Sequence, residues 1–106
     1  MSQSNGALFY VCFAESLRRK LRDWAILTVE QGLRERLLQA YRKISSTLEH
    51  DPFSGEPAYQ LPQMQVTVYR LSFDFLTVYY AIDDKRHIVF VKDVLSSSFV
   101  ELPENE

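Results

Sequence analysis

The stretch MQVTVYRLSFDFLTVYYAIDDKRHIVFVKDV, residues 64–94, decides the fold of this chain. It contains three runs rich in β-branched and aromatic side chains, at residues 65–73, 75–83 and 87–94. Such side chains fit a pleated surface that is packed on at least one face. The connections between the runs are short, and a parallel pair of strands would need a long crossover. The sequence therefore predicts a three-stranded antiparallel meander.

The residues before the meander predict a first strand and then a first helix. Residues 7–13 (ALFYVCF) form a short, continuously apolar run, and its aromatic content suits a strand better than a helix. From Ala14 onward the apolar side chains recur with the 3.6-residue period of a helix. The stripe consists of Leu17, Leu21, Trp24, Ala25 and Thr28. We expect Trp24, the only tryptophan, to anchor this helix on the sheet.

A second helix is expected to end at His50. Its apolar stripe consists of Leu33, Leu37, Ala40, Tyr41, Ile44 and Leu48. Thr28 and Gln31 have the spacing of a capping box, which places the start of this helix there. Pro52 ends it, because proline disfavours the α conformation for the residue before it. The short connection predicts that the two helices form an antiparallel hairpin.

The predicted order is β-α-α-β-β-β, an α+β domain with an antiparallel sheet packed against a helical hairpin. One domain is expected over residues 1–106, with a core at about 7–95 and an acidic tail at 96–106. Residues 51–63 are predicted to be a loop that leads into the meander. The strands are apolar on both faces, so the second face should be covered by the C-terminal tail (Phe99, Val100 and Leu102), a partner or a second copy.

Composition limits the class of protein. The chain has 106 residues, 46% of them hydrophobic, with a net charge of −2 and a single cysteine, Cys12. This balance is not the strongly basic one that is typical of nucleic-acid binders. No apolar run approaches the ~20 residues of a membrane helix, and no basic residue precedes the first apolar run as in a signal peptide. We expect a cytoplasmic protein without membrane contact, in which Cys12 is a small buried hydrophobe.

Arg70 and Lys92 are candidate site residues in the meander. Arg70 is the one charge in the middle of a predicted strand, and such a charge needs a partner or a ligand. It could face a ligand together with Lys92 from the last strand. Alternatively, its side chain reaches along the sheet edge so that the charged end lies in water, or it pairs with Asp74 or Asp93.

His87 is the third candidate. It could act as a general base that is oriented by Asp83 or Asp84. His87 and His50 lie far apart in the sequence, and neither has Cys or His at ligand spacing. We therefore expect no metal site, and no motif indicates a small-molecule cofactor.

Most of the positive charge lies on the predicted helical hairpin. Eight of the twelve Lys and Arg residues are there: Arg18, Arg19, Lys20, Arg22, Arg34, Arg36, Arg42 and Lys43. They could form a patch for nucleic acid or an acidic partner. The favoured interpretation is a solvated helix face, because Glu15, Asp23, Glu30 and Glu35 are interspersed among them.

Three phrases resemble the RelE/ParE superfamily of bacterial toxin–antitoxin toxins. LEHDPFSGEPAYQLP (48–62) resembles the segment that ends a helix in that family, YRLSFDFLTVYYAID (69–83) resembles its hairpin, and HIVFVKDV (87–94) resembles its last strand. The resemblance covers about residues 7–95. It implies the same fold, an antitoxin as protein partner, and a role in plasmid stabilisation.

The sequence departs from the ribosome-dependent ribonuclease branch of that family. That branch has an arginine just before its "viY" phrase, where this chain has Thr77. Beyond His87 the chain has no Arg, Tyr or His, and Lys92 is the only cation. RNA cleavage needs a group that activates the 2′-hydroxyl and cations that stabilise the developing charge. The resemblance thus implies a toxin that binds a partner, with gyrase or the ribosome as targets, rather than one that cleaves mRNA.

Two alternatives remain open. One is a divergent ribosome-dependent endoribonuclease that uses Arg70, Lys92 and His87. The other is a non-toxic interaction module that keeps the fold and forms a homodimer through the apolar sheet face.

Overall fold

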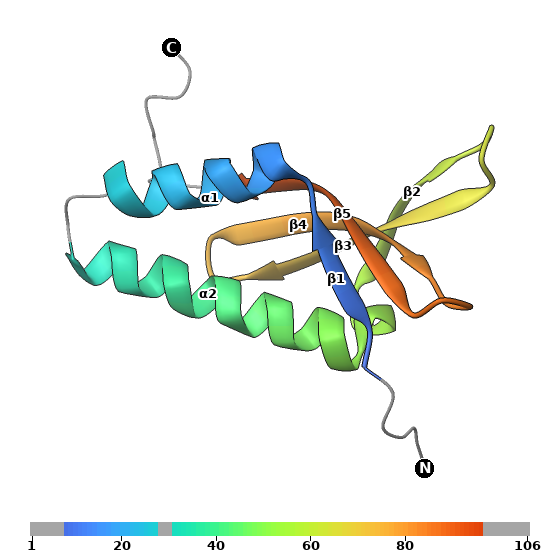
Figure 1. Cartoon of the computed structure of the whole chain (residues 1–106), viewed down its shortest axis with the longest axis horizontal. Coiled ribbons are helices and arrows are strands. Elements are labelled where there is room, and N and C mark those ends of the chain that lie inside the picture. Colours follow the sequence, from blue (N-terminus) through green and yellow to red (C-terminus); the bar gives the residue numbers. More distant parts are fainter. Residues whose placement is uncertain (1–7, 28–30, 97–106) are drawn as a thin grey trace.

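The computed structural model describes residues 8–27 and 31–96. Within them the chain forms two helices on a five-stranded sheet. Figure 1 shows the helices running side by side in opposite directions. The elements are β1 (Tyr10–Phe13), α1 (Glu15–Leu27), α2 (Gln31–His50), the 3-10 turn η2 (Pro52–Ser54), β2 (Glu56–Leu61), β3 (Val66–Phe73), β4 (Leu76–Asp83) and β5 (Ile88–Ser96).

The sheet has the strand order β1-β5-β4-β3-β2. The predicted meander is confirmed, because β3, β4 and β5 pair antiparallel in sequence order. β1 pairs with β5 in parallel, and the long chain between them provides the crossover that parallel pairing needs. The α+β class predicted from the sequence is confirmed.

The sequence missed one strand. Residues 56–61, predicted to be part of a loop, form β2, which pairs antiparallel with β3 at the edge of the sheet. β2 has no run of apolar side chains because it is an exposed edge strand, and an edge also tolerates Pro57, whose missing N–H would break an interior strand. The β2–β3 hairpin extends away from the helices in Figure 1.

One face of the sheet packs against the apolar stripes of both helices. Trp24 is only 5% exposed and anchors α1 as predicted, and Leu48 of α2 is fully buried. Thr28, in the predicted stripe and capping box, lies outside the described residues. The other buried members of this core are Leu17, Leu37, Ala40, Ile44, Phe75, Leu76, Val78, Tyr80, Val89, Val91 and Val94.

Tyr80 ties the end of α2 to the sheet. Its hydroxyl donates a hydrogen bond of 2.6 Å to the carbonyl of Pro52 in η2, and the ring is fully buried. Burial raises the pKa of Tyr80 to about 12, partly offset by a backbone hydrogen bond from Gly55. Gly55 leaves room for this contact, because a Cβ there would overlap the Tyr80 hydroxyl.

The second face of the sheet, the uncovered sheet face, has no described helix over it. Its side chains alternate with those of the core, and exposed apolar ones include Tyr10, Tyr59, Phe90 and Leu95. Val68 is fully buried on this face beside its register partner Tyr59. The face is less apolar than the sequence predicted, because Glu56, Arg70 and Asp93 also lie on it. The tail residues Phe99, Val100 and Leu102 lie outside the described residues, so what covers the face stays a prediction.

Candidate functional site

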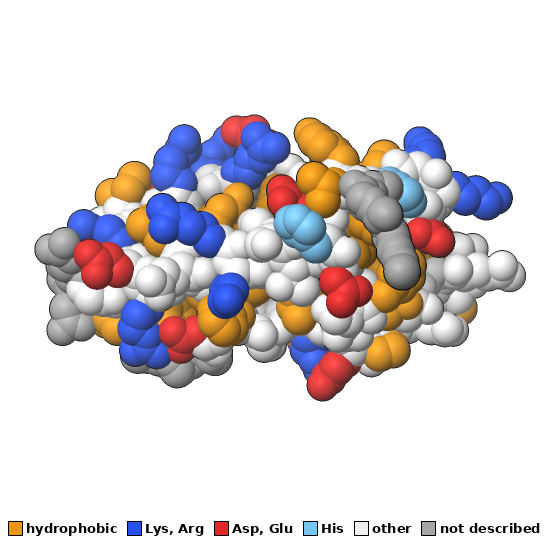
Figure 2. Space-filling model, turned by 90° about the horizontal axis from the view of Figure 1, so that it is seen from below, with side chains coloured by type: hydrophobic (Ala, Val, Ile, Leu, Met, Phe, Trp, Pro, Cys, Tyr) orange, Lys and Arg blue, Asp and Glu red, His pale blue; other side chains and the backbone are white. Residues whose placement is uncertain are grey.

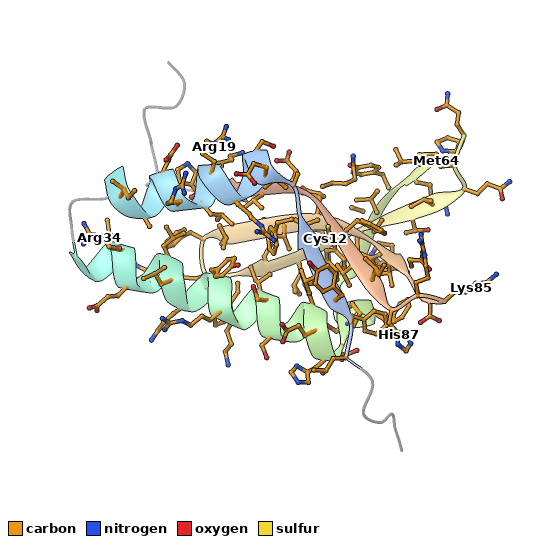
Figure 3. All side chains as sticks on the ribbon, in the orientation of Figure 1. Cys12, Arg19, Arg34, Met64, Lys85 and His87 are labelled. Atoms are coloured by element: carbon orange, nitrogen blue, oxygen red, sulfur yellow. The ribbon has the colours of Figure 1, made fainter. Side chains whose placement is uncertain are left out.

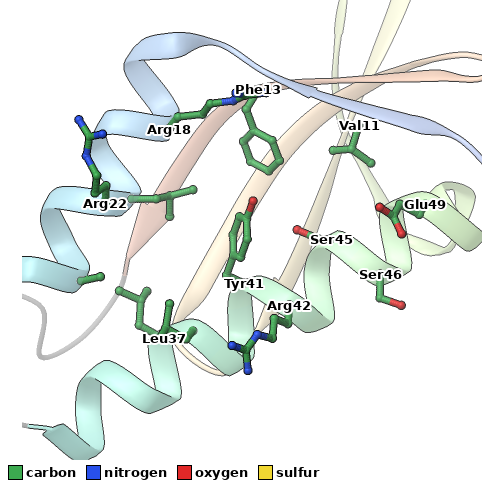
Figure 4. A pocket seen from close by; sticks show the side chains of 13 residues that line it. Val11, Phe13, Arg18, Arg22, Leu37, Tyr41, Arg42, Ser45, Ser46 and Glu49 are labelled. Carbon is green, nitrogen blue, oxygen red and sulfur yellow. The ribbon is translucent and has the colours of Figure 1, made fainter.

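A groove of about 770 Å³ lies between β1, α1 and α2 (Figure 4), and we name it the helical groove. It forms because the apolar stripes of α1 and α2 point toward the sheet, while the two helices make few contacts with each other. The Phe13 ring from β1 and the Tyr41 ring from α2 lie 5.8 Å apart within it. The remaining apolar lining residues are Val11, Leu21, Ala25, Leu37 and Leu38.

Three arginines stand at the helical groove. Arg18 and Arg22 lie one turn apart on α1, and Arg42 lies across from them on α2. All three are exposed, and none has an ion-pair partner among residues 8–27 and 31–96. Within this part of the chain, nothing therefore neutralises the positive charge that they offer to a ligand or partner.

Other cations of the helices behave differently. Arg19 pairs with Glu15 at 3.8 Å, Lys20 with Asp93 at 3.7 Å, and Arg36 with Asp74 at 2.6 Å. Figure 2 shows Lys and Arg side chains gathered over the helical end of the molecule with apolar surface among them. The favoured interpretation of a solvated face thus describes part of this charge, while the unpaired arginines concentrate at the helical groove.

Arg70 lies on the uncovered sheet face. Its guanidinium donates a 2.7 Å hydrogen bond to the carboxylate of Glu56 on β2. Hydrogen bonds to Glu56 and then to Tyr79 raise the pKa of Arg70. Glu56, Arg70, Tyr79 and Asp93 are consecutive register partners across four strands. Arg70 is thus one member of a polar row rather than an isolated cation.

The prediction that Arg70 pairs with Asp74 or Asp93 is wrong. Asp74 binds Arg36 of α2, which holds the pKa of this carboxyl below its usual value, and Asp93 lies near Lys20 of α1. The actual partner, Glu56, could not be predicted, because β2 was not recognised as a strand.

Lys92 and His87 lie elsewhere on β5 and its preceding turn. Lys92 is the extra, exposed residue of a bulge, because Tyr79 pairs with Asp93 and the next residue, Tyr80, already pairs with Val91. Lys92 is therefore near the polar row.

The structure does not bring His87 to Arg70 and Lys92. His87 immediately precedes Ile88, whose partner on β4 lies four residues beyond Tyr79, about 13 Å along the sheet. Figure 3 shows His87 close to Lys85 at the β4–β5 turn. The His87 ring lies 4.6 Å from that of Phe9. Asp83, one of the two predicted orienting residues, is instead bound by Arg86 at 2.8 Å, and this contact lowers the pKa of Asp83.

The described residues contain no group of three or more His, Cys, Asp and Glu side chains that could hold a metal ion. Cys12 is a free cysteine, only half-buried on β1 rather than fully buried as predicted. None of the described helices is long and apolar enough to span a membrane.

The sequence reasoning did not find the helical groove. A signal was present, because Arg18 and Arg22 alternate on α1 with Leu21 and Ala25 at helical spacing. The opposite wall, including Arg42 on α2, follows only from the way in which the two helices are placed.

Comparison with solved structures identifies the fold. The crystal structure of the isolated E. coli RelE toxin matches with a TM-score of 0.53 and 18% sequence identity. The match covers 91% of this chain and 92% of that one. No protein-family model and no curated protein matches the sequence. The chain therefore has the fold of the RelE toxin over nearly its whole length.

Proposed function

We propose that this protein is the toxin component of a type II toxin–antitoxin pair, and that it acts by binding a partner rather than by cleaving mRNA. The observation that carries this proposal is the RelE fold, which extends over nearly the whole chain. The helical groove supports it, because it offers a place for a second protein. The partner that it fits best is an antitoxin segment.

The chemistry of the helical groove matches an amphipathic segment that carries acidic side chains. Exposed apolar side chains that line it, such as Leu38 and Tyr41, would gain free energy by leaving water. Arg18, Arg22 and Arg42 would attract carboxylates and guide the approach of the partner. A disordered antitoxin segment could fold into this groove as it binds.

The uncovered sheet face argues against the usual cleavage chemistry. The Arg70 guanidinium is held by Glu56, so that a phosphate would have to compete with a carboxylate. Thr77, in the place of the arginine in the ribonuclease branch, shares a 2.7 Å hydrogen bond with Ser72. The candidate base His87 lies away from Arg70.

Induction of this chain alone in a bacterial host tests the proposal. We expect growth arrest without new mRNA ends at ribosome-bound messages, and the same arrest with Arg70→Ala. Arg19→Ala is a matched control, because it also removes one exposed, paired arginine. Normal growth with folded protein present would overturn the proposal. A comparison of translation with plasmid supercoiling then separates the ribosome from gyrase as target.

A divergent endoribonuclease remains the second candidate, because Arg70 and Lys92 lie near the same polar row. It predicts cleavage of ribosome-bound mRNA that Arg70→Ala, Lys92→Ala and His87→Ala each weaken. If all three variants cleave as well as the unaltered protein, these site assignments are wrong.

A non-toxic module that dimerises through the uncovered sheet face is the third candidate. Tyr10, 64% exposed on that face, favours it. Sedimentation at several concentrations tests this candidate, and a monomer at every concentration would exclude it.

A further inference from the structure

The two ends of the helical groove carry opposite charge. Figure 4 shows Arg18, Arg22 and Arg42 toward one end and Glu49 at the other. Arg42 and Glu49 are seven residues apart on α2, which corresponds to about 10 Å along the helix. Glu49 has no ion-pair partner within the described part of the chain. An occupant that follows α2 would therefore meet positive charge first and negative charge two turns later.

The middle of the helical groove contains an unsatisfied hydroxyl. Ser45 Oγ is shielded from water and has no hydrogen-bond partner among residues 8–27 and 31–96. A serine within a helix often donates to the carbonyl four residues earlier, but Ser45 does not. A buried hydroxyl without a partner destabilises the free protein. An occupant could remove this penalty by presenting a polar group at this point.

The hydroxyl of Tyr41 lies one turn before Ser45 and also projects into the helical groove (Figure 4). No hydrogen bond to it is found among the described residues. Two hydroxyls thus stand between the positive and negative ends. A purely apolar helix would leave the buried Ser45 hydroxyl without a partner, whereas a polar side chain in its centre would offer it one.

We infer that the helical groove binds a dipolar amphipathic helix of the antitoxin, an inference that rests on the proposed function. Acidic side chains of this helix lie over Arg18, Arg22 and Arg42, and a basic side chain lies over Glu49. A polar side chain between them bonds to Ser45. The free side chains of the groove therefore set the direction in which the partner lies, and not only its affinity.

Synthetic peptides test this inference. Each has roughly 18 residues and the same apolar stripe, because shorter helices are unstable in water. One has Glu in one half, Lys in the other and Gln at the centre, and is made in both directions. The others carry only Glu or only Lys at these positions. Fluorescence anisotropy of labelled peptides measures their affinities for the full chain.

We expect the better of the two dipolar peptides to bind about threefold more tightly than the all-Glu peptide, and the all-Glu peptide about tenfold more tightly than the all-Lys peptide. Glu49→Lys should make the all-Glu peptide the tightest, while Asp84→Lys, a change of equal charge in the distant β4–β5 turn, should leave the order unchanged. Arg18→Glu should weaken the dipolar peptide, and its neighbour Arg19→Glu, which is outside the groove, should do so much less.

Ser45→Ala gives a second readout with opposite signs. We expect the variant to raise the Tm of the free protein and to weaken the Gln-centred peptide about threefold to tenfold. A peptide with Ala at its centre should show no such loss. A lower Tm, or unchanged affinity for the Gln-centred peptide, would overturn the role of Ser45.

Equal affinities of the dipolar and all-Glu peptides, or an order that Glu49→Lys does not change, would overturn the inference. The proposed function is judged separately by growth arrest. Growth arrest without the expected order of peptide affinities would refute the dipolar groove but not the proposed toxin function. The expected order of affinities without growth arrest would support the dipolar groove and refute the proposed toxin function.

Discussion

The contact between Gly55 and Tyr80 gives a sharp prediction about stability. A methyl group added by Gly55→Ala would overlap the Tyr80 hydroxyl and would lie 2.9 Å from the carbonyl oxygen of Arg70. Relief requires the ring or the backbone to move. Movement of the ring would also break the 2.6 Å hydrogen bond from Tyr80 to Pro52.

The magnitude follows from these contacts. Overpacking typically costs about 1–3 kcal/mol, and a buried carbonyl that loses its donor costs a similar amount. We therefore expect Gly55→Ala to lower the free energy of unfolding by about 2–4 kcal/mol. Tyr80→Phe alone should cost about 1–3 kcal/mol, because it leaves the Pro52 carbonyl unpaired.

The double variant carries the decisive information. Tyr80→Phe removes the oxygen with which the new methyl collides, so the two costs should not add. We expect the double variant to be more stable than the sum of the single changes by about 1–2 kcal/mol. Part of the cost remains, because the Arg70 carbonyl and the ring carbon Cζ, at 3.1 Å, still crowd the methyl.

Urea unfolding followed by the fluorescence of Trp24, which is buried in the core, measures these free energies. Gly32→Ala is a control, because nothing lies within 4 Å of its added Cβ, and a helical alanine should stabilise by up to about 1 kcal/mol. If the costs of Gly55→Ala and Tyr80→Phe add within about 0.5 kcal/mol, the steric reasoning is wrong.

Three further predictions concern the core and the titrating groups. The pKa of Tyr80 is about 12 in the folded state against an ordinary value of 10.0, so folding favours the neutral phenol. The stability that this gives should be fully present below pH 10 and should fall as the pH rises toward 12. Tyr80→Phe should remove this alkaline loss, as measured by denaturation midpoints at several pH values. The pKa of Asp74 is lowered beside Arg36, which gives the opposite pH dependence. The contribution of this carboxylate to the free energy of unfolding is present above its unfolded pKa and is lost as the pH falls through the lower folded value. Asp74→Asn should therefore make stability less dependent on pH in the acid range, and a variant as acid-sensitive as the unaltered chain would contradict this. Leu48→Ala, at a fully buried position, should cost about 2–5 kcal/mol in urea unfolding, and a cost under about 1 kcal/mol would place Leu48 outside the rigid core.

The sequence by itself determined the elements whose side-chain pattern is strong. Alternation and β-branched content specified β3, β4 and β5, and the helical period specified α1 and α2. These patterns are readable because each element buries one face, and burial requires apolar side chains at a fixed spacing. The α+β class followed from their order, and the RelE-like fold was what the resemblance of residues 48–62, 69–83 and 87–94 to that family implied.

Only the tertiary structure decided which distant residues meet. The edge strand β2 escaped prediction because an exposed strand needs no apolar pattern, and with it went the pairing of Glu56 with Arg70. The helical groove depends on how far α1 and α2 separate above the sheet, which no local spacing encodes. For the same physical reason, Arg42 and Glu49 became visible as parts of one surface with Arg18 and Arg22 only when α2 was packed beside α1.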